Sequence, residues 1–122
     1  MAGLKVMLVD DEEEFVRTLA ERLEIRGFSV KVALNGERAL DMVGSDIPDV
    51  MVLDLRMPGI DGLEVLRRVK KMAPEVQVVI LTGHGSEQDE EIAQRLGAYE
   101  QLQKPVDLDR LISTLKNAYN ER

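Results

Sequence analysis

Three carboxylates follow two short apolar runs of this chain. Asp54 comes directly after Val50–Leu53, and Asp10 and Asp11 follow Leu4–Val9. Runs this short and this apolar predict strands buried on both faces, so each acid would stand where such a strand reaches the surface. If the two strands are neighbours, the acids repel one another unless a hard cation neutralises them. Mg²⁺ prefers oxygen ligands, and the three acids are candidates to hold it.

A hydroxyl and an ammonium follow two further predicted strands. Thr82 comes after Val76–Leu81, and Lys104 follows Tyr99–Gln103. Both groups can donate hydrogen bonds to the oxygens of a dianion. A carboxylate can form an aspartyl phosphate, and a metal ion and a lysine stabilise charge on the transferring group. The five residues together therefore predict a site at which Asp54 carries a phosphoryl group.

The elements that must position these residues alternate between strand and helix. Strands are predicted at Leu4–Val9, Phe28–Ala33, Val50–Leu53, Val76–Leu81 and Tyr99–Gln103. Helices are predicted at about Glu12 to Arg26, from Asn35-Gly36 through Val43, from Asp61 to Ala73, from Ser86 through Leu96, and from Asp107 through Leu115. Five alternations imply a parallel sheet with helices on both faces.

The polarity of the strands indicates their order in the sheet. The first, third and fourth strands are almost wholly apolar, which predicts that they are central. The second alternates with Ser29 and Lys31, and the fifth carries Glu100, Gln101 and Gln103, so both are predicted to be edges. The order 2-1-3-4-5 satisfies these conditions. It is the flavodoxin-like, doubly wound (βα)5 arrangement of the α/β class, and its ligand site lies between the ends of strands 1 and 3.

The composition indicates one domain spanning residues 1–122. Hydrophobic residues make up 44% and charged residues 32%, as in a soluble globular protein. A net charge of -7 disfavours non-specific binding to nucleic acid or anionic membrane. The absence of cysteine excludes disulfides and thiolate metal sites. The apolar run Leu4–Val9 is too short for a signal peptide or a membrane span, so we expect a cytoplasmic protein.

Each candidate residue has a simpler interpretation when it is taken alone. Asp11 with Glu14 could form a capping box, and Asp54 could be a turn residue before Pro58-Gly59. The run Glu12–Glu14 favours a helix start through the macrodipole. Thr82 and Lys104 could be an ordinary strand end and a solvated lysine. These interpretations do not explain why all of the residues fall at one edge of one predicted sheet.

The same residues closely resemble the receiver domain of two-component response regulators, over essentially the whole chain. The matching segments are Leu8–Asp11, Val52–Gly62, Leu81–Gly83, and Gly97-Ala98 leading to Lys104-Pro105. The resemblance implies that Asp54 accepts a phosphoryl group from the phosphohistidine of a sensor histidine kinase. It implies that Thr82 and Lys104 contact the phosphoryl oxygens, and that the Lys104-Pro105 peptide is cis. Such a domain catalyses only its own phosphorylation and dephosphorylation.

The resemblance also implies a Mg²⁺ site. Asp10, Asp11 and Asp54 would hold the ion with the backbone carbonyl of Arg56, and Asp11 and Asp54 would be the direct side-chain ligands. Arg56 and His84 each follow a site residue by two positions. We hypothesise that these two side chains control the access of water to the acyl phosphate.

One position departs from the pattern of the family. Gln101 stands three residues before the lysine, where the family usually has a Tyr or Phe that moves with Thr82. Tyr99 lies two residues earlier in the chain. The fourth predicted helix has a thin apolar face, and elements with few buried contacts are the ones that shift in a switch. We therefore expect phosphorylation to change the surface formed by the fourth helix, the fifth strand and the fifth helix.

The partners implied are a sensor histidine kinase and a downstream output domain or protein. A phosphorylation-dependent homodimer through the switching surface is a further expectation, without direct contact to nucleic acid or membrane. The chain would be a stand-alone regulator or the N-terminal part of a longer one. Competing functions are an interaction module that is never phosphorylated, a Mg²⁺-dependent phosphatase with Asp10 as nucleophile, and a flavin carrier. A phosphatase of that kind needs an Asp-x-Asp after the first strand, and a flavin carrier needs a hydroxyl- and glycine-rich loop there. This chain has neither.

Overall fold

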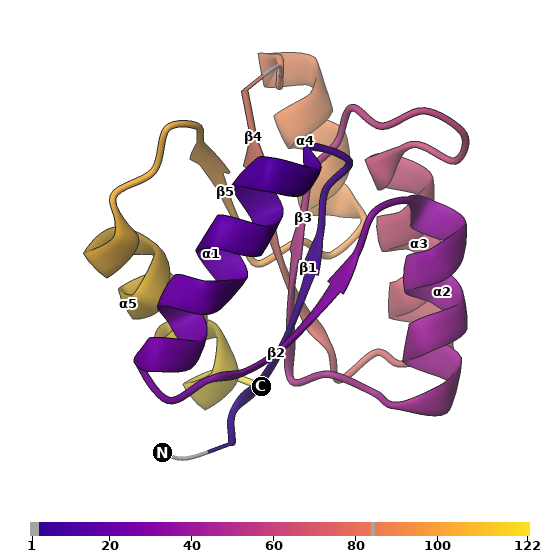
Figure 1. The fold of residues 1–122 in the computed structure, drawn as a ribbon. Coiled ribbons are helices and arrows are strands. Elements are labelled where there is room, and N and C mark those ends of the chain that lie inside the picture. Colours follow the sequence, from indigo (N-terminus) through magenta and orange to yellow (C-terminus); the bar gives the residue numbers. More distant parts are fainter. Residues whose placement is uncertain (1–2, 84) are drawn as a thin grey trace.

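The computed structural model describes residues 3–83 and 85–122, and strands and helices alternate along the chain (Figure 1). The strands are β1 (Lys5–Val9), β2 (Ser29–Ala33), β3 (Val50–Leu53), β4 (Gln77–Thr82) and β5 (Glu100–Gln103). The helices are α1 (Glu13–Ile25), α2 (Gly36–Ser45), α3 (Gly62–Met72), α4 (Glu87–Arg95) and α5 (Leu108–Asn120). Each predicted strand end agrees with the structure to within one residue. None of the described helices is both long enough and apolar enough to cross a membrane.

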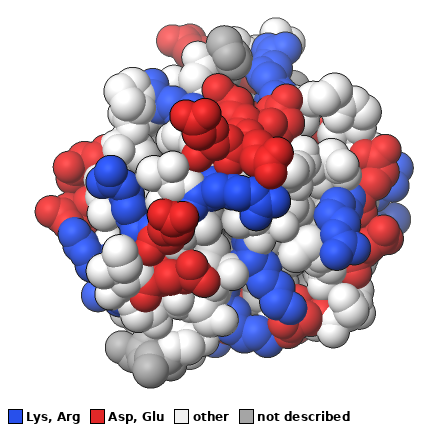
Figure 2. Space-filling model, in the orientation of Figure 1, with Lys and Arg blue, Asp and Glu red and all other residues white. Residues whose placement is uncertain are grey.

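The five strands form one parallel sheet in the order β2-β1-β3-β4-β5. The predicted flavodoxin-like (βα)5 fold and its strand order are therefore confirmed. The register aligns Val9 with Leu53 and Thr82 with Gln103, so the strands end together at one edge. Figure 2 shows acidic side chains gathered in the upper part of the molecule, where Figure 1 places the carboxyl ends of the strands.

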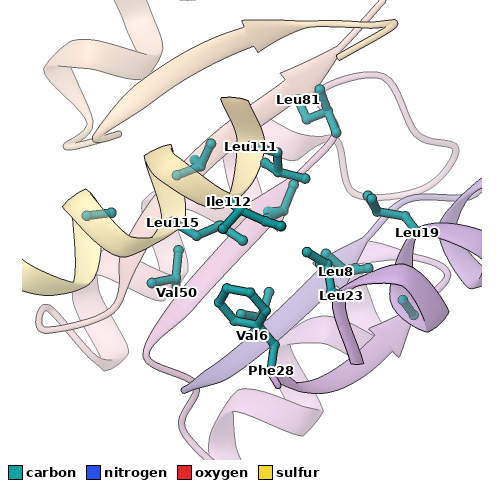
Figure 3. Close-up of a cluster of buried hydrophobic side chains, with 14 of the residues drawn as sticks. Val6, Leu8, Leu19, Leu23, Phe28, Val50, Leu81, Leu111, Ile112 and Leu115 are labelled. Atoms are coloured by element: carbon teal, nitrogen blue, oxygen red, sulfur yellow. The ribbon is translucent and has the colours of Figure 1, made fainter. Parts of the chain in front are cut away.

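Helices cover both faces of the sheet, and each face has its own apolar core. Alternate residues of β1 serve the two faces: Leu8 packs towards α1 and α5, whereas Met7 packs towards α2 and α3. Figure 3 shows the first of these cores, to which α1 contributes Leu23 and α5 contributes Leu111. The three central strands are buried on both faces, which explains why their sequences are almost continuously apolar.

Side-chain caps start four of the five helices. In each of these the capping oxygen accepts a hydrogen bond from the backbone amide three residues later, and the caps are Asn35, Asp61, Ser86 and Asp107. The start of α1 is different. Its N-cap is Glu12, whose side chain makes no capping bond, so the interpretation of Asp11 and Glu14 as a capping box is wrong.

Candidate functional site

Buried polar side chains concentrate at the carboxyl edge of the sheet. Among the described residues, only four polar or charged ones are buried, and three of them are Asp10, Asp54 and Thr82. The fourth is Thr114, whose hydroxyl donates to a carbonyl of its own helix. Backbone bonds hold the three in place: the amide of Asp54 donates to the carbonyl of Val9 at 3.0 Å, because β1 and β3 are neighbours. Burial of polar groups is costly, so their concentration here marks a site rather than a packing accident.

Lys104 is the cation of this site. The amide of Lys104 donates to the carbonyl of Thr82 at 3.0 Å, and this bond sets the side chain at the end of β5 beside β4. Its ammonium lies 2.7 Å from Asp10 Oδ2 and 3.5 Å from Asp54 Oδ2. Burial lowers the pKa of Lys104, but hydrogen bonds to Asp10 and Glu12 outweigh this and raise the pKa above its ordinary value. The lysine therefore stays charged.

Opposing effects act on the pKa of Asp10. Burial raises the pKa of the Asp10 carboxyl, and hydrogen bonds from Lys104 and from the backbone amide of Glu12 lower it. The negative charge of Asp54 raises the pKa of Asp10 further, and the net shift is upward. An additional cation between these carboxylates would relieve both the repulsion and the cost of burial.

Three carboxylates lie close enough to share a metal ion. One oxygen from each of Asp10, Glu12 and Asp54 lies within 4.8 Å of the other two. Asp11 is exposed and is not a member of this group, although the sequence pairs it with Asp10. Three negative charges against one ammonium leave an excess that suits a divalent cation, and the donors are hard oxygens. This donor set fits Mg²⁺.

Sequence reasoning missed Glu12. The run of three glutamates was interpreted only as a favourable helix start, and nothing in its pattern separates the first from the others. The structure separates them, because the Glu12 amide donates to Asp10 Oδ1 at 2.9 Å and its side chain then turns towards Lys104. No sequence signal encodes that direction.

Arg56 joins the site to α4. Its amide donates to Asp54 Oδ1 at 3.3 Å, and its guanidinium donates to Asp89 Oδ2 at 2.9 Å. Asp89 belongs to the first turn of α4, so one residue contacts both the central carboxylate and the helix across from it. His84, the other residue expected to control water access, lies outside the described residues.

Gln101 packs beneath the loop that follows β4. A Cβ built at Gly85 would lie 2.5 Å from Gln101 Nε2 and 2.8 Å from the methyl of Thr82, so the glycine leaves room for the amide. Gln101 Oε1 is buried, and within the described part of the chain no partner donates to it. Tyr99 does not take this place, because its hydroxyl donates to Glu121 at the end of α5 at 2.8 Å. The Lys104-Pro105 peptide is cis, as expected.

A family model places this chain among known proteins. The model for the response regulator receiver domain matches residues 6–116. The NtrX-like response regulator of Rickettsia typhi is 38% identical over 120 residues, covering 97% of this chain and 25% of that protein. Response regulator MprA of Mycobacterium avium is 34% identical over 113 residues, covering 93% of this chain and 50% of that protein. The chain thus spans a quarter to a half of the length of these relatives.

Solved structures agree with this assignment. A receiver domain protein from Clostridium thermocellum has a TM-score of 0.91 and 34% identity, covering 99% of this chain and 96% of that one. A CheY-like receiver domain from Methanospirillum hungatei has a TM-score of 0.93, and at 23% identity it supports the fold alone. The chain belongs to the response regulator receiver domain family, the signalling domains of two-component systems.

Proposed function

We propose that this receiver domain accepts a phosphoryl group on Asp54 from the phosphohistidine of a sensor histidine kinase. The observation that carries the proposal is a buried carboxylate pair, Asp54 and Asp10, that shares one ammonium, Lys104, at the open edge of the sheet. The Lys104 ammonium supplies a counter-charge to both buried carboxylates. A charged carboxylate is the form that can attack phosphorus.

The chemistry is a displacement at phosphorus. An oxygen of Asp54 forms the new O–P bond, the P–N bond to the histidine breaks, and its electron pair returns to the imidazole nitrogen. Thr82 and Lys104 are the groups that would contact the phosphoryl oxygens, and the ammonium already lies 3.5 Å from Asp54 Oδ2. Their hydrogen bonds stabilise charge on the transferring group. The only reactions of the domain would be its own phosphorylation and dephosphorylation.

A Mg²⁺ ion would be held by Asp10, Asp11, Asp54 and the backbone carbonyl of Arg56. Asp11 is exposed beside the group of close carboxylates, so its side chain would have to turn inwards to serve as a direct ligand. When it is bound, the ion supplies positive charge to the phosphoryl oxygens. Asp10 and Asp54 are buried at this edge and would supply the inner carboxylates of the site.

The output would pass through α4, β5 and α5. Only Ala93 of α4 is buried, so this helix is held by little apolar contact and by the Arg56–Asp89 pair at its start. A phosphoryl dianion on Asp54 would attract both Thr82 and Arg56, which contact the loop and the helix. Gln101 under that loop would then move, and the new surface would meet an output domain, a downstream protein or a second copy of the domain.

One experiment tests the proposed phosphorylation. The protein is incubated with acetyl phosphate and Mg²⁺, and its intact mass is compared with that of the Asp54→Ala variant. We expect one phosphoryl adduct in the natural protein, none in the variant, and none when the metal is chelated. No adduct under any condition would show instead an interaction module that is never phosphorylated.

A further inference from the structure

Glu12 directly precedes α1 and makes unusual contacts for a residue in that position. It is the N-cap of α1, yet its side chain caps nothing, and its amide is already bonded to Asp10 Oδ1 at 2.9 Å. Glu13, one residue on, pairs with Arg17 on its own helix, and Glu14 is exposed to solvent. The carboxylate of Glu12 is therefore available to the site rather than to the helix.

The shortest contact of the Lys104 ammonium is with Glu12. The distance from Nζ to Glu12 Oε1 is 2.6 Å, compared with 2.7 Å to Asp10 and 3.5 Å to Asp54. The ring of Phe15, one turn further along α1, lies under the same ammonium at 4.6 Å. Two residues at the beginning of α1 thus contact the same ammonium that lies near Asp54, the proposed carrier of the phosphoryl group.

Asp10 and Glu12 differ in how easily each can break its ion pair with Lys104. The side chain of Asp10 is 6% exposed and cannot lose its counter-charge without a large desolvation cost. The side chain of Glu12 is 62% exposed, so water can replace the lysine at little cost. Glu12 is therefore the partner that Lys104 can exchange for another anion.

We propose that Glu12 is a positioning residue, which holds the Lys104 ammonium in the unphosphorylated domain and releases it to the phosphoryl group on Asp54. The inference rests on the phosphorylation proposed above and goes beyond it, because it assigns a competitor within the site. Lys104 exchanges the Glu12 carboxylate for the phosphoryl group. The balance between these two pairings of the ammonium therefore depends on the charge at position 12.

This assignment predicts two effects of opposite sign for Glu12→Gln. The variant removes a negative charge beside the metal site, so Mg²⁺ binds about threefold more weakly. It also removes the competitor for Lys104 and one repulsive charge against the incoming dianion. At saturating Mg²⁺, acetyl phosphate therefore phosphorylates the variant about threefold faster than the natural protein. A merely structural role for Glu12 would impair both properties together.

The matched control is Glu14→Gln. It removes the same charge from the same turn of α1, and its side chain makes no contact with Lys104 in the described structure. We expect the control to stay close to the natural protein in both the calorimetric Mg²⁺ dissociation constant and the rate of phosphoryl incorporation measured by intact mass. Equal behaviour of the two variants, or slower phosphorylation of Glu12→Gln, would overturn the role of Glu12.

The outcomes also separate this inference from the function on which it rests. If the natural protein gains no phosphoryl adduct, the phosphorylation of Asp54 fails, and Glu12 loses its role with it. If the natural protein is phosphorylated and Glu12→Gln matches Glu14→Gln, only the role of Glu12 fails.

Discussion

Asp54 owes its position to a close approach between backbones. Gly62, the first residue of α3, faces the peptide between Asp54 and Leu55: a Cβ there would collide with the carbonyl oxygen of Asp54 and lie 2.6 Å from the Cα of Leu55. The amide of Gly62 also donates to the carbonyl of Leu55 at 3.0 Å. The absence of a side chain at Gly62 therefore lets α3 begin directly beside the proposed phosphoryl acceptor.

Gly62→Ala should destabilise the domain by about 1–3 kcal/mol, because the added methyl forces backbone apart in a packed region. The control is Gly44→Ala in α2, where a Cβ meets nothing within 4 Å. That substitution should raise the free energy of unfolding by up to about 0.5–1 kcal/mol, because alanine loses less backbone entropy than glycine on becoming helical. Urea denaturation measures both, and a Gly62→Ala variant as stable as the natural protein would contradict the close approach.

Residues at strand ends were predictable, whereas side-chain directions at a helix start were not. Asp10, Asp54 and Lys104 follow strands and Thr82 ends one. A parallel sheet brings strand ends to one edge whatever the details of the loops. Glu12 lies past the strand, where the backbone turns, and its role depends on a hydrogen bond with Asp10 that no periodicity describes. The sequence therefore predicts that these four residues share an edge, as they do in the structure, but it does not place Glu12 beside them.

At the scale of elements, α4 is the loosely held helix. It buries only Ala93, whereas α3 buries four residues against the sheet. Ile92, a large apolar residue of the same helix, is 37% exposed. The Arg56–Asp89 pair then ties the start of α4 to the loop after β3. The thin apolar face seen in the sequence thus corresponds to weak packing in the structure.

Arg56→Ala should speed amide hydrogen exchange in the first turns of α4 about twofold to fivefold, because it removes that tie. Exchange in α3 should not change. Arg95→Ala is the control, since it removes an exposed pair with Glu91 on the same helix and leaves the tie intact. Equal protection of α4 in the natural and Arg56→Ala proteins would show that the ion pair does not restrain the helix.

At the opposite edge of the sheet, Asp46 links two strands. Its carboxylate accepts hydrogen bonds from Lys5 of β1 and Lys31 of β2 at the end of α2. The hydrogen bonds from Lys31 and then Lys5 lower the pKa of Asp46 to about 2. A carboxyl whose pKa falls on folding stabilises the folded state above its ordinary pKa, and that contribution is lost as the pH drops towards the folded value.

The difference in stability between the natural protein and Asp46→Asn should therefore be constant above about pH 5 and should shrink between about pH 4 and pH 2. The side chain is 34% exposed, so the difference is modest and weakens with salt. Asp41→Asn, at an exposed acid of the same helix, is the control. Denaturation curves across this pH range measure the difference in unfolding free energy between the two proteins. A difference that stayed constant on acidification would refute the proposed dependence on Asp46.

At the scale of the molecule, polarity predicted which strands lie at the edges, since β2 and β5 carry more polar residues along their length than the central strands do. The family was likewise visible in the motifs. The surroundings of Gln101 were not visible, because they depend on how β5 packs against the loop after β4. There its side-chain oxygen is buried with no donor among the described residues. The relatives named above are longer proteins than this chain.

Binding of Mg²⁺ should stabilise the whole domain, because the unfolded chain does not bring Asp10 and Asp54 together. At ten times the dissociation constant, the melting temperature should rise by about 5 °C. The rise should persist in Asp41→Asn and fall in Asp54→Ala. Thermal melts with and without the metal measure it, and an unchanged melting temperature in the natural protein would argue against the metal site.

The position of the phosphoryl group is the most direct test of the account. After reaction with acetyl phosphate and Mg²⁺, borohydride reduces an acyl phosphate at its carbonyl carbon and marks the residue that carried it. Trypsin then separates the candidates, because cleavage after Arg17, Arg38 and Arg56 places Asp10 and Asp54 on different peptides. We predict the mark at position 54 alone. A mark at another acid, or no mark in a protein that is folded and metal-bound, would contradict the assignment of Asp54 as the phosphoryl acceptor.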